Sequence, residues 1–143
     1  MVLCDVSVVL SAGMPDSPHH RVCRERIEEL LAAGISFATS ELVLAAVVRI
    51  ATNRKVWKKP ASVGRAFAYV DSLRDHPDAV SIAPGLRHWR IFQDLATKSG
   101  SRGPDTTDAY FAALAMEHGC EWWTADADFA RFPGLRWRNV LVP

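Results

Sequence analysis

The chain has 143 residues, of which 49% are hydrophobic and 23% charged, and its formal net charge at pH 7 is +1. This composition excludes a disordered or fibrous protein, and the length predicts a single domain over residues 1–143. A domain of this size can bury a core without disulfide or metal staples. Three cysteines without a C-x-x-C pair are typical of a reduced protein, so we expect a cytoplasmic location.

The apolar start of the chain, MVLCDVSVVLSAG, is interrupted by Asp5 and has no basic flank. A signal peptide requires such a flank, and a membrane span requires about 20 consecutive apolar residues. The segment therefore predicts neither, and we expect no membrane association.

In the first half of the chain, short apolar segments alternate with amphipathic ones. Strands are predicted at 2–4 and 35–38, and helical segments at 7–10, 18–34 and 41–53. The third helical segment, ELVLAAVVRIATN, is apolar along most of its length, so we expect it to lie deep in the fold.

In the second half, Pro60 and Pro84 predict helix starts, because proline is favoured in the first turn of a helix. Helices are predicted at 60–74, 84–98 and 107–118, and strands at 79–83, 120–124 and 139–142. Thr107 is expected to cap its helix, and the alanines that follow allow that helix to lie close to a sheet. Short strands alternating with helices predict an α/β fold, an α/β/α sandwich around a mainly parallel sheet.

Four acidic residues are predicted to gather at one edge of this sheet. Asp5 and Asp126 end strands, while Glu41 and Asp108 open helices. These positions belong to the carboxyl-end face of a parallel sheet, where open α/β folds bind ligands. Oxygen ligands without histidine or cysteine favour Mg²⁺ or Mn²⁺ over zinc. Unneutralised carboxylates repel one another, so the cluster indicates a bound cation.

Each of these acids also has a structural interpretation. Asp5 could cap the helix that follows it, and Asp126 could hold an Asx turn. Glu41 and Asp108 could stabilise helix dipoles.

Other polar and aromatic residues are interpreted as structural. Asp128 is read as a cap of the DFARF turn, and Asp105 as a loop or cap residue. Trp122 and Trp123 are expected to pack in the sheet rather than stack on bases. The histidines near helix surfaces and ends are expected to be solvated: His19, His20, His88 and His118.

A basic segment is hidden by the near-neutral total charge. No acid occurs from 42 to 70, a stretch that contains Arg49, Arg54, Lys55, Lys58, Lys59 and Arg65. The candidates for binding an RNA backbone are Arg49, Arg54, Lys55 and Lys58. The alternative is a merely solvated face.

Four segments together resemble the motifs of PIN-domain proteins, and more narrowly the VapC toxins of toxin–antitoxin pairs: LCDVSVVL, SELVLAAVVRIATN, TTDAYFAALAMEHG and TADADFARFPGLRW. The resemblance implies a PIN-like sandwich and an Mg²⁺-dependent endoribonuclease in which Mn²⁺ can substitute. It also implies a homodimer that a cognate VapB-like antitoxin inhibits in a hetero-oligomer. The tail of such an antitoxin is expected to place a basic side chain among the acids and apolar ones near Leu42, Val43 and Val47.

By this resemblance the catalytic, metal-binding acids are Asp5, Glu41, Asp108 and Asp126. The supporting residues are Ser7, Thr124 and Asp128. One departure concerns Ala46, because many PIN proteins have a glutamate there, and Glu41 matches an alternative placement. The departure leaves open a catalytically weak PIN-fold module that binds RNA or protein.

Two other enzyme classes place acids at a sheet edge. A phosphotransfer enzyme or a response-regulator-like receiver is disfavoured, because no D-x-D-x-[TV] follows the first strand and no suitably placed lysine follows a late one. A DNA nuclease of the same fold would need added clamping elements, for which the chain lacks room.

Overall fold

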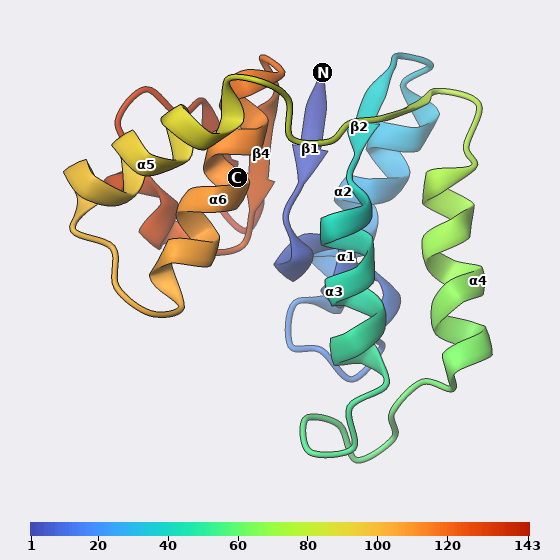
Figure 1. Cartoon of the computed structure of the whole chain (residues 1–143). Coiled ribbons are helices and arrows are strands. Elements are labelled where there is room, and N and C mark those ends of the chain that lie inside the picture. The colour runs from blue at the N-terminus through green and yellow to red at the C-terminus, as the bar shows by residue number, and fades with distance from the viewer.

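Five short strands form the centre of the molecule in the order β3-β2-β1-β4-β5 (Figure 1). The computed structural model describes residues 1–143. The strands are β1 (Val2–Cys4), β2 (Phe37–Thr39), β3 (Ala79–Ser81), β4 (Glu121–Thr124) and β5 (Trp137–Asn139). Every pairing is parallel, so the predicted mainly parallel sheet is confirmed.

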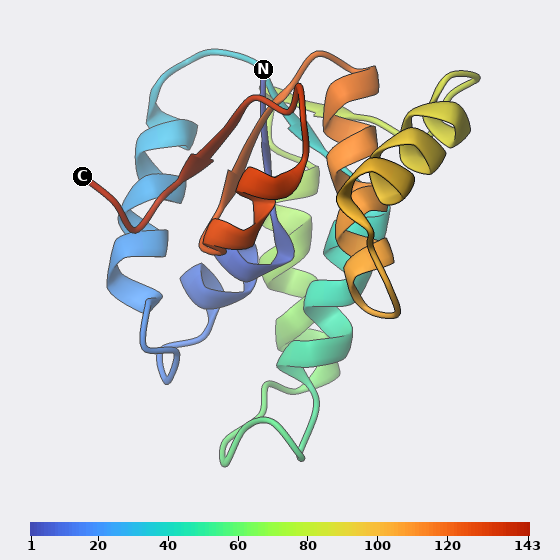
Figure 2. The ribbon, with the colours of Figure 1, turned by 90° about the vertical axis from the view of Figure 1, so that its left-hand side faces the viewer.

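Helices cover both faces of the sheet. They are α1 (Val6–Gly13), α2 (His20–Ala32), α3 (Glu41–Ala51), α4 (Val63–Arg74), α5 (His88–Ser99) and α6 (Asp105–Glu117), with a 3₁₀ turn η1 (Ala127–Arg131). Figure 2 shows α1 and α2 on one side of the strands and α5 and α6 on the other, as in the predicted sandwich. The α3–α4 hairpin extends past the carboxyl ends of the strands. None of the helices combines the length and apolarity needed to cross a bilayer.

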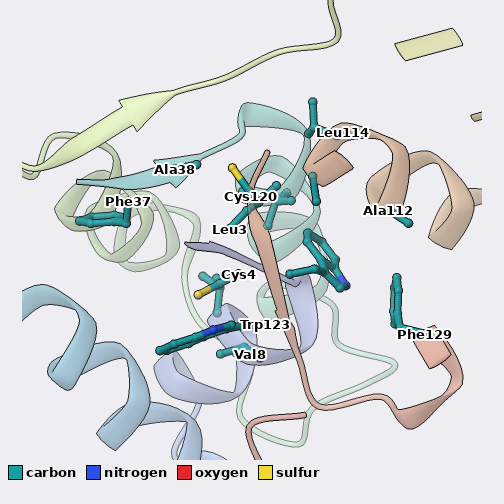
Figure 3. Packing of buried hydrophobic residues seen from close by; sticks show 14 of the residues in the cluster. Leu3, Cys4, Val8, Phe37, Ala38, Ala112, Leu114, Cys120, Trp123 and Phe129 are labelled. Carbon is teal, nitrogen blue, oxygen red and sulfur yellow. The ribbon is translucent and has the colours of Figure 1, made fainter. Parts of the chain in front are cut away.

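Side chains along β1 and β4 point alternately to the two faces of the sheet, so the core has two halves, one on each face. Leu3 pairs in register with Trp122, and Cys4 with Trp123. Trp122 is fully buried and stacks on Phe111 of α6, with ring centroids 6.0 Å apart. On the opposite side of β1, Cys4 and Trp123 lie beside Val8 of α1 (Figure 3). Both tryptophans therefore pack in the sheet, as predicted.

Small side chains bring α6 close to the sheet. Its alanines at 109, 112, 113 and 115 are completely buried, as is Leu114. Because an alanine projects only a methyl group, the helix axis can approach the strands closely enough for Trp122 to fill the remaining space. The expectation drawn from the alanine-rich sequence is confirmed.

Tertiary contacts shift several element boundaries. The helix predicted from Pro84 begins only at His88, because Glu117 accepts the N–H groups of Gly85 (2.7 Å) and Arg87 (3.0 Å) and holds the segment in a loop. The helix predicted from Pro60 begins at Val63, after Ser62 caps it. The last strand lies at Trp137–Asn139 instead of 139–142.

Two burial predictions are wrong. His88 is buried, with its Nε2 2.9 Å from the carbonyl oxygen of Tyr110, because α5 packs tightly on α6. Helix α3 is buried on one face only, since it reaches beyond the sheet and packs mainly against α1 and α4. Val43 and Val47 are 2% and 1% exposed and cannot receive a partner, whereas Leu42 is 43% exposed.

Candidate functional site

Asp5 lies at the carboxyl end of β1, at the start of α1, and is buried. Its side chain makes no capping hydrogen bond with the helix, so the capping interpretation is wrong. Its Oδ2 instead accepts the hydroxyl protons of Ser7 (3.0 Å) and Thr124 (2.6 Å). This leaves Oδ1 without a side-chain donor.

Backbone groups orient the two hydroxyls that hold Asp5. The Ser7 hydroxyl accepts the N–H of Ala125 at 3.2 Å, and the Thr124 hydroxyl accepts the N–H of Asp126 at 3.0 Å. With its lone pair engaged in this way, each hydroxyl directs its proton toward the carboxylate. The contacts give Ser7 and Thr124 a concrete means of supporting Asp5.

Asp126 ends β4 and caps η1. Its Oδ1 accepts the N–H of Asp128 at 2.8 Å, the Asx turn that the sequence suggested, while Oδ2 has no hydrogen-bond partner. The interpretation of Asp128 as the cap is wrong, because Asp128 supplies the N–H and Asp126 the capping oxygen.

Asp108 lies in the first turn of α6 and is paired with Arg131 of η1. Arg131 Nη2 donates to Asp108 Oδ2 at 2.9 Å and lies 3.8 Å from Asp105 Oδ1. Asp105 opens α6, so that helix begins two residues before Thr107, which is not its cap. Nothing in the sequence singled out Arg131; the signal that could have done so is its position between Phe129 of η1 and Phe132, the residue that follows η1.

The acids influence one another's ionisation. Burial raises the pKa of Asp5, and the negative charge of Asp108 raises it further, although the bonds from Thr124 and Ser7 oppose the shift. Burial also raises the pKa of Asp108, and the charges of Asp126 and Asp105 add to this, while Arg131 opposes it. The charge of Asp108 therefore acts on Asp5, and the charge of Asp126 acts on Asp108.

Glu41 does not join this site. Its side chain is 68% exposed and faces α4, where Arg74 Nη2 lies 3.9 Å from its Oε2. Glu41 is not among the charges that shift the pKa of Asp5 or Asp108. No three acidic, histidine or cysteine side chains converge as a ready metal-binding group, Asp5, Asp108 and Asp126 included.

The donor set nevertheless fits a hard divalent cation. Asp5, Asp108 and Asp126 each commit one carboxylate oxygen to the protein and keep the other free of hydrogen bonds from side chains. Mg²⁺ prefers oxygen ligands. Burial and neighbouring acids disfavour the negative charge of these carboxylates, and a bound cation would relieve that. The site also already attracts one cation, the guanidinium of Arg131.

The basic segment lies apart, at the end of the α3–α4 hairpin (Figure 1). Arg49, Arg54, Lys55 and Lys58 are all exposed, and none of them forms an ion pair. Unpaired, exposed cations are available to a polyanion, which keeps the RNA-binding prediction open.

The sequence profile of the PIN domain matches residues 2–135. Among solved structures, VapBC2 from Rickettsia felis, bound to a DNA fragment from their promoter, has a TM-score of 0.68 and 17% identity, and the match covers 96% of this chain and 98% of that one. The fold and the acidic edge thus define a PIN domain.

Curated relatives identify a narrower class of protein within the PIN-domain family. Ribonuclease VapC43 from Mycobacterium tuberculosis (strain ATCC 25618 / H37Rv) is 38% identical over 141 residues, which cover 99% of this chain and 96% of that protein. Ribonuclease VapC25 from the same strain is 37% identical over 136 residues, covering 95% and 96%. The chain therefore belongs to the VapC ribonucleases of the PIN-domain family, and the resemblance read from its motifs is confirmed.

Proposed function

We propose that the protein is the Mg²⁺-dependent endoribonuclease toxin of a VapBC-type pair. The observation that carries this proposal is the buried carboxylate of Asp5, held by two hydroxyls and near enough to Asp108 for that negative charge to raise its pKa. A purely structural aspartate would be paired with a cation or neutralised, whereas Asp5 keeps an oxygen free and receives only neutral donors.

Asp5, Asp108 and Asp126 would hold Mg²⁺, or Mn²⁺ in its place, through their carboxylates. Glu41 joins them only if its side chain leaves Arg74. The ion would neutralise the scissile phosphate and activate a water for phosphodiester hydrolysis. Ser7 and Thr124 keep the Asp5 carboxylate in one orientation, and Asp126 stays fixed by the η1 turn. By family resemblance, the products are a 5′-phosphate and a 3′-hydroxyl.

The basic connection between α3 and α4 would bind the RNA backbone through Arg54, Lys55 and Lys58, with Arg49 at the end of α3. A cognate VapB-like antitoxin would inhibit the enzyme, and the homodimer expected of this family would form the toxin half of the hetero-oligomer. Of the apolar residues expected to receive the antitoxin, Leu42 is the accessible one; it lines a depression of about 290 Å³ together with Phe92, Thr106, Thr107, Tyr110 and Phe111.

The test is RNA cleavage by Asp108→Asn. We expect activity to fall by about 100-fold or more, the scale of losing one charge-stabilising group in a hydrolytic site. The thermal midpoint of the metal-free protein should stay equal or rise, because burial disfavours the ionised Asp108 and an asparagine oxygen can still accept from Arg131. RNA cleavage is measured in Mg²⁺, in Mn²⁺ and with EDTA.

The matched control is Asp94→Asn on α5, which removes an exposed carboxylate that pairs with Lys98 at 3.0 Å, outside the site. It should leave cleavage unchanged. An Asp108→Asn enzyme as active as this control would exclude the assignment. Metal-independent RNA binding without turnover by the unaltered protein would favour the binding-module alternative that Ala46 left open.

A further inference from the structure

Arg131 is the only cation that forms an ion pair with the acids around the site. Its Nη2 lies 2.9 Å from Asp108 Oδ2 and 3.8 Å from Asp105 Oδ1. No lysine, histidine or other arginine lies within ion-pair distance of Asp5, Asp108 or Asp126.

Other contacts hold Arg131 independently of Asp108. Its Nη1 donates to the carbonyl oxygen of Asp128 at 2.7 Å, and its guanidinium lies 4.5 Å from the ring centroid of Phe132. If the Nη2 bond to Asp108 broke, these two contacts would still keep the side chain beside the site. The Nε atom is buried without a hydrogen-bond partner, so the present position leaves one donor unsatisfied.

The contact occupies an oxygen of a proposed metal ligand. A guanidinium and a divalent cation compete for the same carboxylate, because each needs its lone pairs and its negative charge. A guanidinium left within a few ångströms of a bound ion would also repel it. A cation fixed at this point must therefore weaken divalent binding, whatever else it stabilises.

We propose that Arg131 is a built-in counter-cation, a positioning residue that holds Asp108 in the metal-free protein and that a divalent cation displaces. The proposal rests on the function proposed above, since it takes Asp108 to be a metal ligand. Arg131 would neutralise the cluster while the site is empty, and would set the divalent concentration at which the enzyme is loaded.

Calorimetric titration with Mn²⁺ in the absence of RNA tests the proposal. Arg131→Gln removes the charge, Arg131→Lys keeps it without the planar fork, and Arg24→Gln on α2 removes an exposed guanidinium that pairs with Glu28 at 2.8 Å. We expect Arg131→Gln to lower the Mn²⁺ Kd about tenfold, the scale of a unit charge acting on a double charge a few ångströms away in water. Arg131→Lys should stay near the unaltered protein, and Arg24→Gln should match it.

An Mn²⁺ Kd in Arg131→Gln equal to or higher than that of the unaltered protein would overturn the proposal while leaving the ribonuclease assignment intact. Absence of Mn²⁺ binding by the unaltered protein would overturn both. Circular dichroism establishes that each variant is folded.

A second measurement does not depend on whether Arg131→Gln is folded. The Nε–H resonance of Arg131, assigned by its loss in Arg131→Lys, should move when the unaltered protein is saturated with Mg²⁺, while that of Arg24 should not. An Arg131 resonance that does not respond to Mg²⁺ in a protein that binds the ion would contradict displacement.

Discussion

Gly13, the last residue of α1, lies directly against the ring of Tyr69 on α4. The hydroxyl of Tyr69 on α4 donates to the carbonyl oxygen of Val9 on α1 at 2.6 Å, which fixes its ring against Gly13. A Cβ at position 13 would lie 2.4 Å from that ring. Because the ring cannot move without losing its hydrogen bond, Gly13→Ala should lower the free energy of unfolding by about 1–3 kcal/mol.

The control for this substitution is Gly64→Ala, measured in the same urea unfolding experiment. Gly64 lies in the first turn of α4, and a Cβ there would meet no atom within 4 Å. Alanine is the better helix former, so this variant should be neutral or gain up to about 1 kcal/mol. Equal effects at both glycines would contradict the close packing at Tyr69.

Asp5 makes stability depend on pH in a defined direction. Burial raises its folded-state pKa above the unfolded value, so ionised Asp5 destabilises the metal-free protein at neutral pH. This cost disappears as the pH falls through the folded pKa toward the ordinary aspartate value of 3.8, because Asp5 is then protonated in both states. Asp5→Asn should therefore be more stable than the unaltered protein at pH 7 in EDTA.

The advantage of Asp5→Asn should shrink as the pH falls. Both hydroxyls bind the same oxygen, Oδ2, so an asparagine oxygen can keep them. Urea unfolding of both proteins from pH 7 to 4 measures the difference. A pH-independent difference would show that the charge of Asp5 carries no such cost.

At the residue scale, the sequence predicted the parts of the site that depend on strand ends. Asp5, Ser7 and Thr124 meet because parallel pairing of β1 with β4 aligns their carboxyl ends. The orientation of Glu41 and the pairing of Arg131 with Asp108 were not predictable in this way. Both depend on side chains of other elements, α4 and α6, whose positions no local pattern encodes.

Helices and strands were predictable where the local sequence preference and the tertiary contacts favour the same structure. The alanine-rich α6 and the order of short strands and helices followed from composition and spacing. Helix starts at Pro60 and Pro84 were misplaced, because proline permits a helix start without requiring one. At 85–87, hydrogen bonds to Glu117, on an element later in the chain, decided the conformation.

The connection between α3 and α4 is the element that carries the RNA-binding prediction. Replacing Arg54, Lys55 and Lys58 together with serine should weaken RNA binding and flatten its dependence on salt. Each lost phosphate contact should reduce the slope of log K against log salt by roughly 0.7 for a single strand. Fluorescence anisotropy with labelled RNA at several salt concentrations measures the slope.

The matched control replaces three arginines of α2 with serine. Arg21, Arg24 and Arg26 are each paired with a glutamate of the same helix, so they offer no free charge to a phosphate. Their loss should leave the slope unchanged. A slope that also stays unchanged in the connection variant would make that element a solvated surface.

For the whole molecule, a divalent ion that binds only the folded state must stabilise the fold. At 100 times its Kd the gain is about 2.7 kcal/mol. The thermal midpoint should therefore rise with Mg²⁺, and should rise much less in Asp108→Asn. NaCl at matched ionic strength separates binding from screening. Equal shifts with Mg²⁺ and NaCl would exclude a specific ion site.

The hydrogen bond between Thr124 and Asp5 joins residues 119 positions apart. A nascent chain still on the ribosome has made Asp5 long before β4, and before η1 brings Arg131 to Asp108. Since β1 pairs with β4 at the centre of the sheet, neither the core nor the acidic edge can be complete until β4 and η1 have been synthesised. We therefore expect the proposed ribonuclease to be inert, and unable to cut its own message, until residues as far as Arg131 have left the ribosome.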